Sequence, residues 1–172
     1  MPKEKIIVLM GSRRDHKFAS RVGDFLREEG FPITCDYNVA SAHRTPQKLL
    51  NDLQEYENSG DNIVLITVAG LSDALSGVVA GYTKYPVIAC PPDSEKYEGA
   101  KIFSSVATPK GIPVAYIPEP ENAALAAAKI LALSNHSLYE SLRRYKQKTE
   151  KNVYESAEEV KKSSKSQGKR SK

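Results

Sequence analysis

Residues 62–70 read NIVLITVAG, an apolar run that ends in two small residues. Its length and its β-branched side chains make it the clearest strand pattern in the chain. Residues 72–81 follow, and their small side chains suit a helix that packs closely against a sheet. The sequence therefore predicts a strand at 62–68 and a helix at about 72–81.

The same strand-then-helix pattern recurs on both sides of this run. Residues 5–10, KIIVLM, form an apolar segment that ends at Gly11, as in a buried strand that turns into a helix. Thr45 and Pro46 suit the N-cap and first position of a later helix. Further strands are expected at 31–39, 85–89 and 113–117, and further helices around 18–26, 97–106, 122–133 and after 138. This alternation predicts an α/β fold, a three-layer αβα sandwich with a central parallel sheet.

Composition is that of an ordinary globular protein of one domain. Of the 172 residues, 40% are hydrophobic and 27% charged, and no stretch has the roughly 18 apolar residues of a membrane span. The N-terminus enters a strand without a signal-peptide pattern, which favours the cytoplasm. Cys35 and Cys90 are expected as free buried thiols, although nothing in the sequence forbids a disulfide. No cysteine–histidine cluster has the spacing of a zinc site, so no metal is expected.

Charge is unevenly distributed along the chain. The net charge of +4 divides into −3 for residues 1–140 (14 basic, 17 acidic) and +7 for residues 141–172 (11 basic, 4 acidic). A basic tail can bind nucleic acid, but the Lys/Ser-rich end at 161–172 has no interleaved aromatic residues. We therefore expect a solvated, disordered end and no nucleic-acid partner.

Two polar runs follow expected strands and precede expected helices: GSRRD at 11–15 and SAHRTP at 41–46. Open α/β sheets bind ligands at the carboxyl ends of their strands. In the first run, Gly11 allows a tight turn, helix N–H groups attract anions, and Arg13 or Arg14 can add charge-assisted hydrogen bonds. The alternative is that Asp15 only caps a helix while the arginines face water.

His43 stands out in the second run because an imidazole can both take and give a proton near neutral pH. Ser41 lacks a nucleophile elbow and an evident orienting acid, which argues against a serine hydrolase. At a third strand end, the small residues of 69–77 leave room for a flat ligand, or they serve tight helix–strand packing. The three runs together predict a site for an anionic small molecule.

These segments, in this order, resemble the 5-aminoimidazole ribonucleotide (AIR) carboxylase family, commonly called the PurE family. The first matches its G-S-x-S-D loop with Arg14 in place of the second serine, and SAHRTP matches the family motif at every position. Further matches are YPVIACPP at 85–92, PKGIPV at 109–114 and NAALAA at 122–127. The resemblance covers roughly residues 5–140 and implies a flavodoxin-like fold.

The family has two branches, which differ after the third strand. The mutase branch, which uses an N5-carboxylated ribonucleotide, reads G-G-A-A-H-L-P-G, and Ala74 takes the place of its histidine here. The branch that uses carbon dioxide reads A-G-R-S-N-G-L, which is closer to AGLSDAL at 69–75. Leu71 in place of arginine, and Arg44 where this branch often has lysine, are departures from it.

The resemblance therefore implies a carboxylase of purine biosynthesis that converts AIR and CO₂ reversibly to 4-carboxy-AIR, with no ATP, biotin, metal or other cofactor. His43 is then the acid/base residue at carbon 4. Asp15 is expected on the ribose and Ser12, Ser41 and Arg44 on the phosphate. The full set of expected substrate-binding residues is Gly11, Ser12, Arg14, Asp15, Ser41, Ala42, Arg44, Gly70, Leu71 and Ser72. The mutase, and a non-catalytic nucleotide-binding protein of the same fold, remain the alternatives.

The family also implies a homotetramer or homo-octamer. Residues 122–133 are apolar nearly all round, so we expect a neighbouring subunit to cover part of that helix. The chain then divides into a catalytic domain at 1–137, a C-terminal helix at 138–160 that contacts another subunit, and a basic tail at 161–172.

Overall fold

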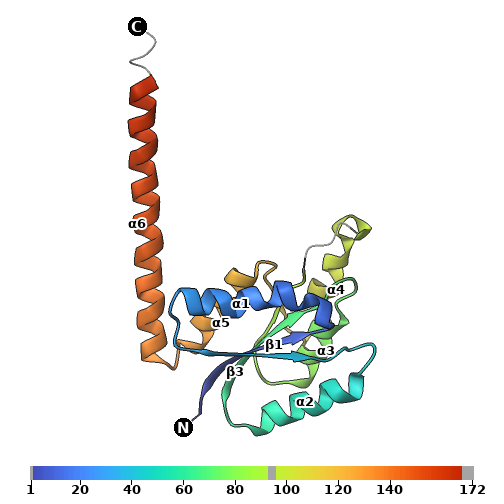
Figure 1. Ribbon diagram of the computed structural model, residues 1–172. Helices are drawn as coiled ribbons and strands as arrows, with labels where there is room; N and C mark the ends of the chain where they lie inside the picture. The colour runs from blue at the N-terminus through green and yellow to red at the C-terminus, as the bar shows by residue number, and fades with distance from the viewer. Residues whose placement is uncertain (1, 93–95, 168–172) are drawn as a thin grey trace.

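A five-stranded parallel sheet forms the centre of the protein, seen here in a computed structural model that describes residues 2–92 and 96–167 (Figure 1). The strand order is β2-β1-β3-β4-β5, which is the flavodoxin-like order. The strands are β1 (Glu4–Met10), β2 (Thr34–Val39), β3 (Asn62–Val68), β4 (Val87–Ala89) and β5 (Ala115–Tyr116). The predicted α/β fold with a central parallel sheet is confirmed.

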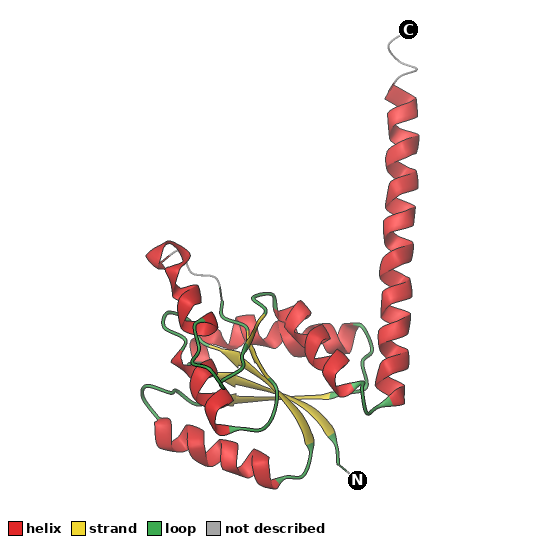
Figure 2. Cartoon of the chain, turned by 180° about the vertical axis from the view of Figure 1, so that it is seen from behind, coloured by secondary structure: helices red, strands yellow, loops and turns green. Residues whose placement is uncertain are grey.

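Helices cover both faces of this sheet, as Figures 1 and 2 show. One face carries α1, α5 and the first turns of α6, and the other carries α2 and α3. The helical elements of the described residues are η1 (Arg13–Asp15), α1 (His16–Glu28), α2 (Pro46–Asn58), α3 (Ala74–Tyr82), η2 (Lys96–Ile102), α4 (Phe103–Val106), α5 (Pro120–Leu131) and α6 (His136–Gln167), where η denotes a 3₁₀ turn. None of them is long and apolar enough to cross a bilayer.

The alternating side chains of β1 form the centre of two separate cores. Ile6 and Val8 pack toward α1 and α5, whereas Ile7 and Leu9 pack toward α2 and α3. Burying each such side chain contributes about 1.5–3 kcal/mol. Cys90 is a free thiol in the first core, and burial raises its pKa to about 12, so it is not a ready nucleophile.

The structure corrects three expectations about the elements. The helix expected at 97–106 is a 3₁₀ turn followed by one α-turn, because Gly99 adopts a left-handed φ of 79°. The strand expected at 113–117 shrinks to two residues; Pro113 has no N–H to donate. Residues 161–167, expected to belong to a disordered tail, continue α6, while 168–172 lie outside the described residues.

α6 leaves the body of the protein after its first turns and projects as a long rod (Figure 1). Its base is held by Tyr145, whose ring packs edge-on against Phe25 at 5.6 Å, and by the Lys148–Glu29 ion pair at 2.8 Å. α5 is covered mainly by its own chain, since half of its residues are buried against the sheet, α1 and α6. The expectation that a neighbouring subunit covers part of α5 stays a prediction, and the apolar surface open to such a contact includes Ile130, which is 36% exposed.

Tyr37 joins β2 to the middle of α1. Its hydroxyl accepts a hydrogen bond from the Gly23 N–H at 3.0 Å and donates to the Ser20 carbonyl at 3.3 Å. A Cβ atom on Gly23 would lie 2.3 Å from that hydroxyl oxygen. A glycine is thus required in the interior of this helix to admit the phenol.

Gly23→Ala should destabilise the protein, although glycine-to-alanine changes inside helices normally stabilise by about 0.5–1 kcal/mol. We expect a loss of about 1–3 kcal/mol, measured by urea unfolding, because the new methyl group overpacks the site. In a Tyr37→Phe background the loss should be smaller, since the next nearest ring atom lies 3.4 Å from the added Cβ. Equal losses in both backgrounds would contradict this account.

Candidate functional site

An open cleft of about 680 Å³ lies at the carboxyl ends of β1, β2 and β3. The site lies where the chain order of the strands reverses, the usual ligand position in such sheets. Its volume is that of a small-molecule site. The cleft is lined by Gly11, Ser12, Arg14, Asp15, Ser41, Ala42, His43, Arg44, Ala69, Gly70, Leu71, Ser72 and Leu75.

The loop after β1 is tied to the end of β3. The Gly11 N–H donates to the Val68 carbonyl at 2.9 Å, and a Cβ on Gly11 would touch Ala69 at 3.4 Å. Ser12 caps η1 by accepting from the Arg14 N–H at 3.3 Å. This short first turn brings Ser12, Arg14 and Asp15 to the same side of the cleft.

Asp15 occupies the N-cap position of α1, but its carboxylate makes no capping hydrogen bond to that helix. The carboxylate instead lies beside Gly70, where an added Cβ would be 3.9 Å from Oδ1. Burial raises the pKa of this carboxyl, while the Ser12 hydrogen bond and the charges of Arg44 and Lys101 oppose the rise. The side chain is therefore available to a ligand rather than committed to the helix.

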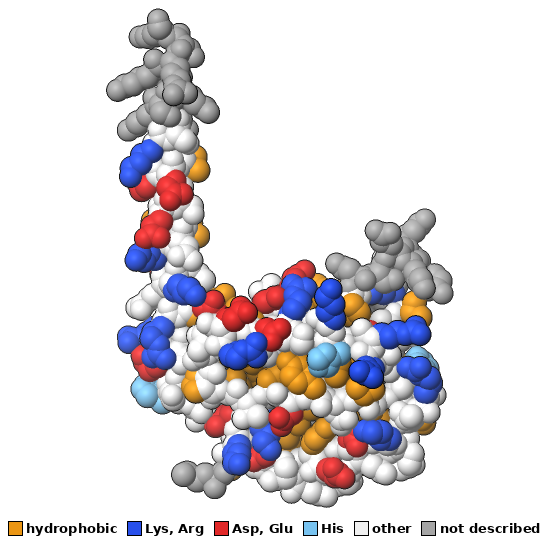
Figure 3. Space-filling model, viewed as in Figure 1, with side chains coloured by type: hydrophobic (Ala, Val, Ile, Leu, Met, Phe, Trp, Pro, Cys, Tyr) orange, Lys and Arg blue, Asp and Glu red, His pale blue; other side chains and the backbone are white. Residues whose placement is uncertain are grey.

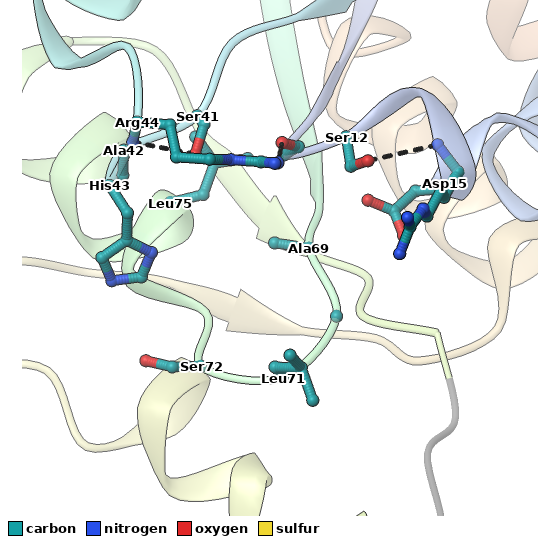
Figure 4. A pocket seen from close by; sticks show the side chains of 13 residues that line it. Ser12, Asp15, Ser41, Ala42, His43, Arg44, Ala69, Leu71, Ser72 and Leu75 are labelled. Carbon is teal, nitrogen blue, oxygen red and sulfur yellow. Dashed lines mark hydrogen bonds between the residues drawn. The ribbon is translucent and has the colours of Figure 1, made fainter.

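The loop after β2 is a compact turn that crosses to the first loop. The Ser41 N–H donates to Thr45 Oγ1 at 2.9 Å, and Ser41 Oγ accepts from the Arg44 N–H at 3.2 Å. The Arg44 guanidinium then reaches the Gly11 carbonyl at 3.1 Å (Figure 4). Thr45 holds the expected N-cap position, but its hydroxyl serves this turn and not α2. Arg44 is thus fixed between the two loops.

His43 lies at the exposed edge of this turn. Figure 4 shows its ring projecting toward the side of the cleft on which Ser72 lies. Within the described residues the ring makes no hydrogen bond, so both nitrogens are open to a ligand or to water. This is the arrangement that a proton-transfer group at a substrate requires.

The segment after β3 forms the remaining wall. Leu71 has a left-handed φ of 58° and is 49% exposed to solvent. Such a conformation costs a residue other than glycine about 1–2 kcal/mol. The backbone around Gly70 and Leu71 therefore places an apolar side chain at the cleft at some energetic cost.

All eleven residues that the sequence singled out line this one cleft. Sequence reasoning missed Ala69 and Leu75 as lining residues, although both fall within the small-residue segment that it had noted. His16 and His136 do not line the cleft. In the described part of the chain, no three His, Cys, Asp or Glu side chains form a group that could hold a metal ion.

Comparison with known proteins gives a consistent result. Residues 5–152 match the family model described as AIR carboxylase. A phosphoribosylaminoimidazole carboxylase from Archaeoglobus fulgidus is 40% identical, over 91% of this chain and 84% of its own. An N5-carboxyaminoimidazole ribonucleotide mutase from Methanocaldococcus jannaschii is 41% identical, over 91% and 97% of the two chains. The crystal structure of Treponema denticola PurE superposes with a TM-score of 0.85 at 38% identity, covering 89% of this chain and 96% of that one.

Asp15→Asn should raise the thermal unfolding midpoint at pH 7. Because the folded pKa of Asp15 lies above its unfolded value, stability falls as pH rises between the two, and at pH 7 the ionised carboxylate carries the full burial cost. The amide removes that charge, and partial exposure limits the gain to about 1–2 °C. The gain should vanish near pH 3 in calorimetry, and the exposed Glu55→Gln should show none. A lower unfolding midpoint of Asp15→Asn at pH 7 would show that the ionised carboxylate stabilises the folded protein, contrary to this prediction.

Proposed function

The chain belongs to the AIR carboxylase family, and within it we propose that the protein carboxylates AIR with CO₂ to give 4-carboxy-AIR, reversibly and in the cytoplasm. The observation that carries the proposal is the cleft itself. Among its lining residues, His43 carries the one imidazole, a group that can both accept and donate a proton, and it lies opposite a segment with space for a planar ring.

For the carboxylation of AIR, the protein has to hold AIR and CO₂ in contact and to transfer one proton. AIR is an enamine, so its carbon 4 attacks the carbon of CO₂ and the electron pair of one C=O bond moves to oxygen, leaving a carboxylate. Carbon 4 then holds both the new carboxylate and its original proton. His43 removes that proton, and the C–H electron pair restores the aromatic ring. Holding the nucleotide and the gas together contributes the rest of the rate.

The residues of the cleft can bind different parts of the nucleotide. Arg44 and Arg14 supply positive charge, and Ser12 and Ser41 supply hydroxyls, on the side suited to the phosphate. Asp15 is an acceptor for the ribose hydroxyls. Gly70, Leu71 and Ser72 face the ring and CO₂, and the apolar Leu71 suits an uncharged gas.

The mutase reaction is the runner-up, because a mutase of similar identity is among the relatives. Ala74 is the first residue of α3, and the resemblance to the family implies that it takes the place of the mutase branch's additional histidine. The carboxylase relatives from Archaeoglobus fulgidus and Treponema denticola match over segments of 156 residues, nearly as long as the 158 residues of the mutase match. The missing imidazole favours CO₂ as the direct substrate.

A substrate comparison tests the proposal. Purified protein should form 4-carboxy-AIR from AIR and bicarbonate, with carbonic anhydrase present to keep CO₂ in equilibrium. It should convert N5-carboxyaminoimidazole ribonucleotide slowly. Efficient use of the N5-carboxylated substrate with no use of bicarbonate would refute the carboxylase assignment.

His43→Asn should retain the fold and nucleotide binding but lose carboxylation and decarboxylation. General acid–base catalysis typically contributes about 10²–10⁴-fold, and kcat should fall by that amount. His136→Asn, at an exposed histidine away from the cleft, is the matched control and should keep full activity. Turnover by His43→Asn within about threefold of the parent would exclude this role.

We also propose that the protein assembles as a tetramer or octamer, with α6 in the contact between subunits. On the outer half of α6, Val153, Tyr154 and Val160 are 68%, 75% and 65% exposed. A helix of this kind is marginal in water without a partner. Its charges favour a second copy: residues 143–151 are mainly basic and residues 155–159 mainly acidic, so two antiparallel copies would be complementary.

Replacing Val153 and Val160 together by glutamate should dissociate the assembly, measured by sedimentation at micromolar concentration. The charges would stand where apolar side chains meet across the contact. Asn152→Glu, at an already polar exposed position, is the control, and deletion of the residues after Lys161 should leave the number of subunits in the assembly unchanged. A parent protein that sediments as an active monomer would rule the assembly out.

A further inference from the structure

A buried carboxylate lies directly behind the cleft wall formed by Leu71 and Ser72. Asp73 is 1% exposed, and its Oδ1 accepts from the Ser76 N–H at 3.1 Å. Its Oδ2 accepts from the Ser105 hydroxyl at 2.8 Å. Both oxygens of this buried side chain are therefore hydrogen-bonded inside the protein, one to α3 and one to α4.

The same residue is also held through its backbone. The Asp73 N–H donates to Ser104 Oγ at 2.9 Å, and the Ser104 hydroxyl in turn donates to the Lys101 carbonyl at 2.7 Å. Two consecutive serines of α4 therefore bind one residue, one through its amide and one through its carboxylate. We call the group Asp73, Ser104 and Ser105 the Asp73 clamp.

The clamp fixes one end of the segment that lines the cleft. The other end of this segment is attached to β3, the central strand of the sheet, which ends at Val68. Between them Leu71 holds its left-handed φ of 58°, and such conformations persist only where the surrounding structure enforces them. The carboxylate and amide contacts of Asp73, two residues later, are the nearest such constraint.

Capping of α3 explains only part of this arrangement. The Ser76 contact is an ordinary N-cap bond, which a serine or asparagine could make as well. The bonds to Ser104 and Ser105 lie outside α3 and join the cleft wall to an element about thirty residues away. A charged acceptor strengthens such a bond roughly twofold over a neutral one.

We propose that Asp73 is a positioning residue for the CO₂ end of the cleft, which it shapes by anchoring Leu71 and Ser72 to α4. The inference rests on the proposed carboxylase function. It assigns no contact between Asp73 and substrate. Loss of the clamp lets the wall relax and weakens the capture of CO₂, while the nucleotide keeps its contacts with the loops after β1 and β2.

The test uses full-length Ser105→Ala, Asp73→Asn and the double variant, with Michaelis constants for AIR and for CO₂ measured separately. Each single variant should raise the KM for CO₂ about tenfold, the effect of losing one charge-assisted hydrogen bond. The KM for AIR should change less than about twofold. The double variant should resemble the single ones, because all three weaken the same Asp73–Ser105 contact.

Ser141→Ala is the matched control, since it removes a buried serine hydroxyl from α6, away from the cleft. It should leave both constants unchanged even if it lowers the unfolding midpoint. If Asp73→Asn does not fold, Ser105→Ala and Ser104→Ala show whether loss of the clamp raises the KM for CO₂ selectively. Suppose that the parent enzyme is active. If the clamp variants then leave both Michaelis constants unchanged, or raise those for AIR and CO₂ equally, the positioning role alone is overturned. A parent without carboxylase activity would overturn the proposed function and this inference with it.

Discussion

The position of β1 between β2 and β3 is the constraint on which the rest of the protein depends. The register pairs Met10 with Val39 on one side and with Val68 on the other, so the three strands end at the same level. Hydrogen bonds from the Ala40 and Gly11 amides continue this pairing one residue beyond the strands. A one-residue slip of β1 would turn every side chain of that strand to the opposite face and exchange the residues that it gives to the two cores.

This level edge explains how three loops can serve one small cleft. The loops after β1 and β2 each contribute a hydroxyl and a guanidinium, to which the first adds a carboxylate and the second an imidazole. The segment after β3 contributes backbone, an apolar side chain and the Ser72 hydroxyl. Arg44 spans the first two through the Gly11 carbonyl. The chemical groups stand on short connections from buried strands, which suits a reaction that depends on placement.

The cleft and the outer part of α6 differ in the kind of residue environment that they contain. Near the cleft, Asp15 and Leu71 are kept in states that cost stability, one by burial and the other by backbone strain. Far from it, α6 exposes charged faces and an interrupted apolar stripe, visible on the projecting rod in Figure 3. The first pattern is typical of a binding site and the second of a surface that meets another chain.

Sequence alone determined the elements whose signals are local. Apolar runs such as 62–68 specify strands, and the alternation with helices specifies a parallel sheet, so polar runs at 11–15 and 41–46 had to meet at one edge. Tertiary structure decided what depends on contacts between distant residues. The Arg44–Gly11 bond, the hydroxyl of Tyr37 inside α1, and the Asp73–Ser105 contact each join segments that no periodicity links. The same holds for the burial of α5 by its own chain, because packing, and not local pattern, selects which faces meet.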